Sequence, residues 1–219
     1  MNQHRVDDFE CCCLASAHGR VSRSTLPQSA KTAEAAKRAN TMGFLSPAPY
    51  HILSYGILLG TTFFHSFIGG IIAFRVLPRP QFSALMAKVF PVYFAMQTTL
   101  PLIMVLTYPA PASFPTLSGV TGVLDPTNRW SVATPLSGAF LTALANLVVV
   151  GPATTRVMRE RKEQEKKDGK KSYDPGPHSP AMQALNKQFS MLHGISSLLN
   201  LGTFLSAVAY GYTLSLRLS

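Results

Sequence analysis

The chain has 219 residues, of which 47% are hydrophobic and 14% are charged, and its formal net charge is +10. The hydrophobic content alone is ordinary for a soluble protein. The placement of charge excludes more, because all 20 Lys and Arg and all 10 Asp and Glu residues lie outside four long apolar stretches. A soluble helix needs a polar face toward water, so this pattern excludes a soluble bundle. The sequence predicts an all-α fold, an integral membrane four-helix bundle.

The first part of the chain differs in composition from the rest. Residues 1–43 are expected to form a disordered, mobile N-terminal tail with a short helix at 31–40, and residues 44–219 to form the transmembrane domain. The tail has no apolar core of the kind found in secretory signal peptides. Its three consecutive cysteines are no disulfide framework, and S-acylation, soft-metal binding and an incidental presence all stay open for them: Cys11, Cys12 and Cys13.

Four membrane spans are predicted within the transmembrane domain. They cover residues 51–74, 89–108, 130–150 and 191–216, and each is close to the roughly 20 residues that cross about 30 Å of hydrocarbon. A short amphipathic piece, 81–88, is expected before the second span. Residues 109–129, rich in Pro, Ser, Thr and Gly, are expected to form an irregular loop, after which Trp130 suits an interfacial anchor.

A charged segment follows the third span. Residues 156–171 alternate basic and acidic side chains, with opposite charges four positions apart at Arg159–Glu163 and Glu163–Lys167. This pattern predicts a solvated helical extension. The Pro-rich residues 173–180 then predict a break before the fourth span.

The basic residues predict the orientation of the chain in the membrane. Five lie near the membrane on the side of the termini, and twelve lie in the two turns that join spans one to two and three to four: Arg75, Arg79, Lys88, Arg156, Arg159, Arg161, Lys162, Lys166, Lys167, Lys170, Lys171 and Lys187. Basic residues remain on the cytosolic side, so both turns are expected in the cytosol. The same residues favour anionic lipid head groups as partners over nucleic acid.

Polar side chains inside the spans form the candidate site. In span four, three of them recur at helical spacing, and the predicted intramembrane polar cluster consists of His65, Gln97, Asn146, His193, Ser197 and Asn200. One interpretation is a central site for a metal, a small solute or a proton. The favoured interpretation is hydrogen-bonded cross-linking of helices, because no span contains an acidic residue. The small residues of Gly56-x-x-x-Gly60 are read as a helix-packing motif.

Several short motifs, taken in order, resemble one known family. The chain resembles the transmembrane protein 205-like family over about residues 50–210, through His51, Arg75, Pro78, Arg79, Lys88, Pro91, Pro152, Thr154, Thr155 and Gly194. The resemblance implies four spans and an activity that is not settled. A more distant similarity to copper-resistance or haem-related four-helix families rests on the histidine that opens span one. Leu59 replaces the aromatic residue expected before Gly60, so no metal and no cofactor is predicted.

These observations favour a non-enzymatic membrane protein with a structural or accessory role. The alternative is a transporter, or a metal- or haem-handling protein, that uses intramembrane His and Asn residues such as His51, His65 and His193. The lipid bilayer is the expected partner, and a protein partner or a homo-oligomer stays open. The endoplasmic reticulum or the plasma membrane is favoured over the mitochondrion, because Asp7, Asp8 and Glu10 are untypical of a mitochondrial presequence.

Overall fold

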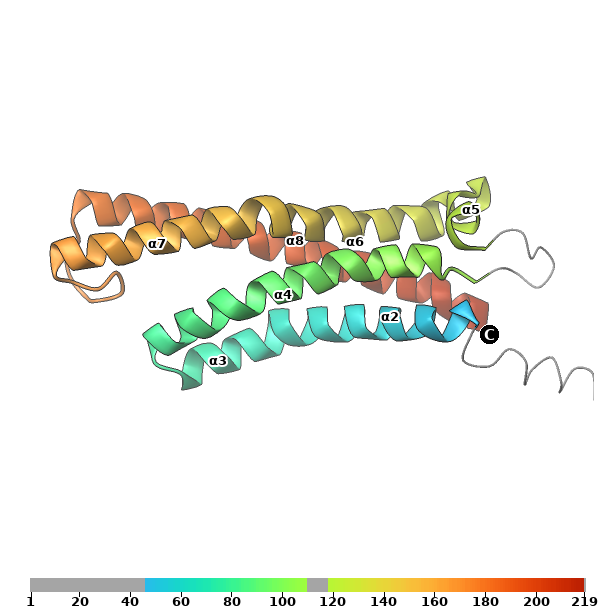
Figure 1. Cartoon of the computed structure of the whole chain (residues 1–219), viewed down its shortest axis with the longest axis horizontal. Helices are drawn as coiled ribbons and strands as arrows, with labels where there is room; N and C mark the ends of the chain where they lie inside the picture. Colours follow the sequence, from blue (N-terminus) through green and yellow to red (C-terminus); the bar gives the residue numbers. More distant parts are fainter. Residues whose placement is uncertain (1–45, 110–117, 219) are drawn as a thin grey trace, which may run out of the picture. The chain divides into compact units, whose positions relative to one another are not determined.

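A computed structural model describes residues 46–109 and 118–218 of the chain (Figure 1). The predicted tail, its short helix at 31–40 and the three cysteines lie outside the described residues. So does most of the first half of the predicted loop 109–129.

Four long helical rods make up the described part of the chain. The first runs through α2 (Pro47–Phe63), the π-helical segment η2 (Phe64–Gly69) and α3 (Gly70–Val76). The second is α4 (Arg79–Leu106), and the fourth is α8 (Pro180–Leu218). The third rod comprises five segments: η3 (Pro126–Asn128), η4 (Arg129–Ala133), α6 (Thr134–Ala145), η5 (Asn146–Val150) and α7 (Gly151–Asp168). A short helix, α5 (Gly119–Leu124), precedes it.

All four rods are long and apolar enough to cross a membrane. The predicted all-α fold with four membrane spans is therefore confirmed. Each rod extends beyond its apolar stretch, because Arg, Lys, Glu and Gln are good helix formers and let a helix continue into water. The piece predicted separately at 81–88 is the beginning of α4. The predicted charged extension is α7, which continues the third span without a break.

The rods are antiparallel and neighbour one another in the order α2, α4, α6, α8, with α8 also beside α2. The turn between α3 and α4 and the turn between α7 and α8 lie at one end, and α5 and the C-terminal end of α8 lie at the other (Figure 1). The α7 and α8 helices pair with each other beyond the bundle, away from α3 and the start of α4 (Figure 1). This pair is called the α7–α8 hairpin below.

Small residues allow α6 and α8 to approach closely. A β-carbon at Gly138 would lie 2.9 Å from the Ser206 hydroxyl oxygen, and one at Gly202 would lie 3.2 Å from Cγ2 of Thr142. Such contacts are typical of membrane helix pairs, which pack through small side chains. The two glycines of the packing motif predicted in span one make no such close contact, because β-carbons at Gly56 and Gly60 would meet nothing within 4 Å.

Gly202→Val should therefore destabilise the protein by about 1–3 kcal/mol, the usual cost of overpacking a close contact. Gly194→Val is the matched control, since the same substitution in the same helix meets open space. Thermal unfolding in detergent measures both variants. Equal melting temperatures for the two would contradict the close approach of α6 and α8.

Candidate functional site

Buried polar side chains from all four rods gather near the middle of the bundle. We call Thr62, Gln97, Asn146, Asn200 and Thr203 the mid-bundle polar layer. Four of them are 0% exposed and Asn200 is 9% exposed. In a membrane, polar side chains turn inward and find partners, as these do.

On the side of α2 and α4, Gln97 is the central residue of the layer. Its Nε2 donates to Oγ1 of Thr62 at 3.1 Å and to the Tyr93 hydroxyl at 2.9 Å. The Tyr93 hydroxyl also lies 3.1 Å from the Ser66 hydroxyl. These bonds join the first two rods near the middle of the bundle.

On the side of α6 and α8, Asn146 has the corresponding role. Its Nδ2 donates to Oδ1 of Asn200 at 3.2 Å and to the backbone carbonyl of Ser196 at 3.3 Å. The hydroxyls of Thr142 and Thr203 lie 2.8 Å apart. The last two rods are thus joined by polar contacts at the same depth.

Two oxygens of the layer have no hydrogen-bond partner. They are Oε1 of Gln97 and Oδ1 of Asn146, and both are buried. An unpaired buried acceptor is costly, so each such group in a native protein needs an explanation. Two π-helical segments also begin at this depth, with η2 starting two residues after Thr62 and η5 starting at Asn146. Single π-helical turns occur frequently at functional sites.

The structure places the other predicted cluster residues apart from the layer. His65 is half-buried against Tyr93 and Phe90, with ring centroids 4.5 and 5.3 Å away. His193 is exposed and stacks on Phe189, and Ser197 is exposed and donates to the His193 carbonyl at 2.9 Å. Of the six predicted residues, the structure therefore gathers only Gln97, Asn146 and Asn200.

A second buried polar group lies at the end of the bundle that carries the C-terminal end of α8. His51 is 0% exposed, its Nε2 hydrogen-bonds the Tyr210 hydroxyl, and its Nδ1 lies 3.3 Å from Oγ1 of Thr107. The His51 ring meets Tyr108 edge-on at 5.9 Å. The sequence singled out His51 but none of its three neighbours.

Arg217 closes this end of the bundle from α8. Its guanidinium lies 5.0 Å from the centre of the Tyr108 ring and donates to Oδ1 of Asn128 at 2.7 Å. The bond to Asn128 ties α8 to the start of the third rod, and Asn128 in turn donates to the carbonyl of Gly122 in α5 at 2.7 Å. Nearby, hydrogen bonds from the hydroxyl and backbone N–H of Thr127 hold the pKa of the Asp125 carboxyl below its usual value.

The remaining family-motif residues lie outside both buried polar groups, on the helices and in the first turn. Arg79 stacks on Phe74 across the first turn, with the guanidinium carbon 3.7 Å from the ring centre. The hydroxyls of Thr154 and Thr155 bond the carbonyls of Val150 and Gly151. The others lie exposed on the helices or in the first turn: Arg75, Pro78, Lys88, Pro91, Pro152 and Gly194.

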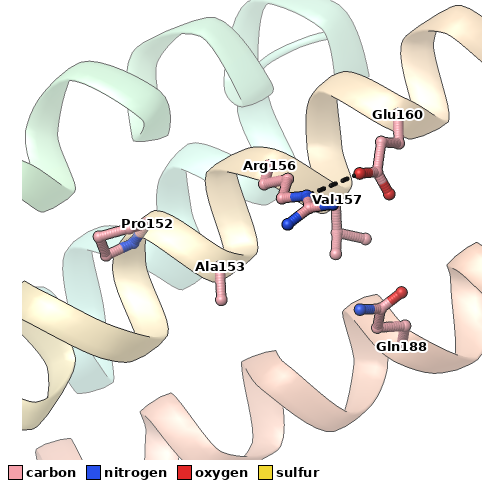
Figure 2. Close-up of a pocket in the computed structure, with 6 residues that line it drawn as sticks. All are labelled: Pro152, Ala153, Arg156, Val157, Glu160 and Gln188. Carbon is pink, nitrogen blue, oxygen red and sulfur yellow. Dashed lines mark hydrogen bonds and ion pairs between the residues drawn. The ribbon is translucent and has the colours of Figure 1, made fainter.

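A hollow of about 580 Å³ opens between α7 and α8 (Figure 2). Its lining is Pro152, Ala153, Arg156, Val157, Glu160 and Gln188. Figure 2 shows the Arg156–Glu160 ion pair along α7, facing Gln188 on α8. Because the two charges neutralise each other, the hollow has no excess of either sign.

The α7–α8 hairpin has a basic outer face. Within residues 118–218, the acidic groups Glu160, Glu165 and Asp168 are bonded to neighbours in the hairpin. Arg159, Lys162 and Lys166 are exposed and have no ion pair in the described structure. Their spacing of three and four residues places them on one helix face. We call these three residues the basic stripe.

The described residues contain no group of three or more His, Cys, Asp or Glu side chains that could hold a metal ion. His51 lies near the start of α2, whereas His193 lies in the part of α8 that packs beside α7. These two histidines, which were considered for the alternative function, therefore do not converge.

The apolar rods and the polar layer between them define a multi-pass helical membrane protein. Residues 53–163 match the family described as Domain of unknown function (DUF4149). The chain is 33% identical over 167 residues to "Xanthocillin biosynthesis cluster protein D" of Aspergillus fumigatus, a match that covers 76% of this chain and 88% of the relative. The chain belongs to the DUF4149 family. No solved structure matches it.

Proposed function

We propose that this protein has a structural or accessory role in its membrane, in which the bundle anchors the α7–α8 hairpin at the cytosolic surface and the basic stripe binds anionic lipid head groups. The observation that carries the proposal is the basic stripe itself. Glu160, Glu165 and Asp168 are engaged within the hairpin, and Glu163 on the same face offsets one of the three charges of the stripe, which leaves net positive charge available to a partner.

The hairpin is also held as a unit, so the stripe is presented on an ordered surface. Nε of Arg161 donates to Oδ1 of Asn186 at 3.0 Å, and its guanidinium carbon lies 4.6 Å from the centre of the Phe189 ring. Met182 beneath them is 0% exposed. A fixed row of three cations over about 10 Å matches a surface of anionic head groups better than a single point ligand.

Removing the stripe should weaken binding to anionic lipid. Each Lys or Arg near an anionic surface contributes about 1 kcal/mol, so Arg159→Gln, Lys162→Gln and Lys166→Gln together should weaken binding by about one to two orders of magnitude. Purified protein in detergent would be titrated with short-chain phosphatidylserine, with phosphatidylcholine as the neutral lipid. Added salt should weaken the phosphatidylserine binding of the unaltered protein.

Glu163→Gln is the matched control, because Glu163 lies on the same face and carries the opposite charge. It should bind phosphatidylserine at least as well as the unaltered protein. Equal affinity of the unaltered protein for both lipids, or an unchanged affinity in the triple variant, would contradict the proposal.

The family match and the four apolar helices support a multi-pass membrane protein and assign no activity to it. We propose that the chain is one of the transmembrane protein 205-like proteins within its family, and that it lies in the endoplasmic reticulum or the plasma membrane. The Aspergillus relative is named for a biosynthesis cluster. That name is compatible with an accessory membrane protein that works beside biosynthetic enzymes and has no catalytic site of its own, and we propose the same kind of role for this chain.

A further inference from the structure

We propose that the mid-bundle polar layer is a binding site for a small neutral molecule that carries at least two N–H or O–H donors. The unpaired oxygens of Gln97 and Asn146 are its acceptors. This inference is independent of lipid binding by the basic stripe, which lies on the hairpin.

The two amides lie at the same depth in the bundle. Phe94 of α4 packs against Gly151 of the third rod, where a β-carbon would lie 3.7 Å from the Phe94 ring. Gln97 is three residues from this contact along α4, and Asn146 is five residues from it in the antiparallel rod. At about 1.5 Å per residue, the axial offset between the two amides is about 3 Å.

Both amides also face the inside of the bundle. Gln97 and Asn146 are 0% exposed, and each bonds a different neighbouring rod, Gln97 to α2 and Asn146 to α8. The rods that carry the two amides are neighbours, since α4 contacts both α6 and η5.

The hydrogen-bond pattern of the structure leaves the oxygen of each amide without a partner. The Ser196 carbonyl can only accept, so it fixes Nδ2 of Asn146 toward α8 and leaves Oδ1 unpaired. The two partners of Gln97 are both hydroxyls on its Nε2 side, and its Oε1 has no partner. A ligand that donates to these oxygens would complete the network.

The chemistry of the layer selects a neutral ligand. The apolar stretch of each rod contains no Asp, Glu, Lys or Arg, so a dehydrated cation would have no counter-charge there. Apolar side chains close the layer on one side, among them Leu58, Leu100 and Met104, and Phe94 and Val150 lie on the other side. Enclosed in this way, a small donor molecule would exchange bulk water for the two amide oxygens.

Urea and guanidinium provide a matched pair of probes, because they have similar size and planar shape and differ in charge. The full chain, with ¹⁵N-labelled Asn and Gln side chains, would be titrated in detergent with each probe at concentrations up to about 100 mM, which is far below denaturing concentrations. Nuclear magnetic resonance would follow the side-chain amides, assigned from the spectra of Gln97→Met and Asn146→Leu.

Urea should shift the Gln97 and Asn146 signals saturably and with one half-saturation concentration, while exposed Gln188 shifts only in proportion to concentration. In Gln97→Met, the Asn146 shift should need about tenfold more urea, as expected when one of two hydrogen bonds to the ligand is lost. Thr99→Val, at an exposed position of α4, should titrate like the unaltered protein.

A layer that only cross-links helices would give non-saturable shifts like those of Gln188, and this result would overturn the proposal. Saturation by guanidinium at lower concentration than urea would overturn the neutral class of ligand. The titration of the unaltered protein decides the question by itself, so a Gln97→Met protein that fails to fold does not rescue the proposal.

Discussion

Replacing His51 with Ala is expected to destabilise the protein by about 3 kcal/mol. The imidazole is fully buried between α4 and α8, where it bonds Tyr210 and approaches Thr107. Alanine would leave a cavity against Tyr108 and would remove the partner of the Tyr210 hydroxyl, which belongs to a residue 1% exposed. Both the lost packing and the unpaired hydroxyl act in the same direction.

His193→Ala is the matched control for this substitution. His193 is exposed, and its ring stacks on Phe189 of its own helix, so its loss should change stability by less than about 0.5 kcal/mol. Tyr210→Phe isolates the hydrogen bond and should cost about 1 kcal/mol, in the range of bonds within membrane bundles. Thermal unfolding in one detergent measures all three variants. A His51→Ala protein as stable as His193→Ala would show that the buried histidine is not structural.

The membrane spans could be predicted from the sequence because absence of charge is a property of each segment alone. Four stretches without Asp, Glu, Lys or Arg were sufficient to predict four rods, and the rods are present. Helix ends were less predictable. Nothing in the apolar pattern indicates that α4 begins at Arg79, or that α7 continues the third span through Gly151 and Pro152.

The candidate site was predictable only in part, because helical spacing defines a face but not where that face has a neighbour. Asn200 and Thr203 are buried where α8 crosses α6. His193 lies seven residues before Asn200 on a similar face of α8, yet it is exposed. At that point α8 is beyond the centre of the bundle and packs beside α7. Pairs such as His51 and Tyr210, far apart in the chain, require the packing of helices to be known.

The orientation of the bundle gives the second large expected effect. Single cysteines would be introduced at Gln81, Gln164, Ser118 and Ser219 in a chain whose Cys11, Cys12 and Cys13 are replaced by Ser. A membrane-impermeant maleimide applied from the cytosolic side of a sealed membrane should label the cysteines at 81 and 164, and it should reach those at 118 and 219 only from the opposite side or after the membrane is permeabilised. The reason is the excess of basic residues, twelve against five, on the two turns that join the spans.

The structure makes the pairs of positions informative. Gln81 follows the turn between α3 and α4, and Gln164 lies in α7 near the other turn, at the same end of the molecule (Figure 1). Ser118 precedes α5 at the opposite end. Labelling of 118 and 219 from the cytosolic side, with 81 and 164 protected, would reverse the orientation and place the basic stripe outside the cytosol, where the lipid-binding proposal would lose its anionic surface. Labelling of 164 and 219 from one side would contradict the four-span arrangement itself, since α7 and the C-terminal end of α8 lie at opposite ends of the antiparallel bundle (Figure 1).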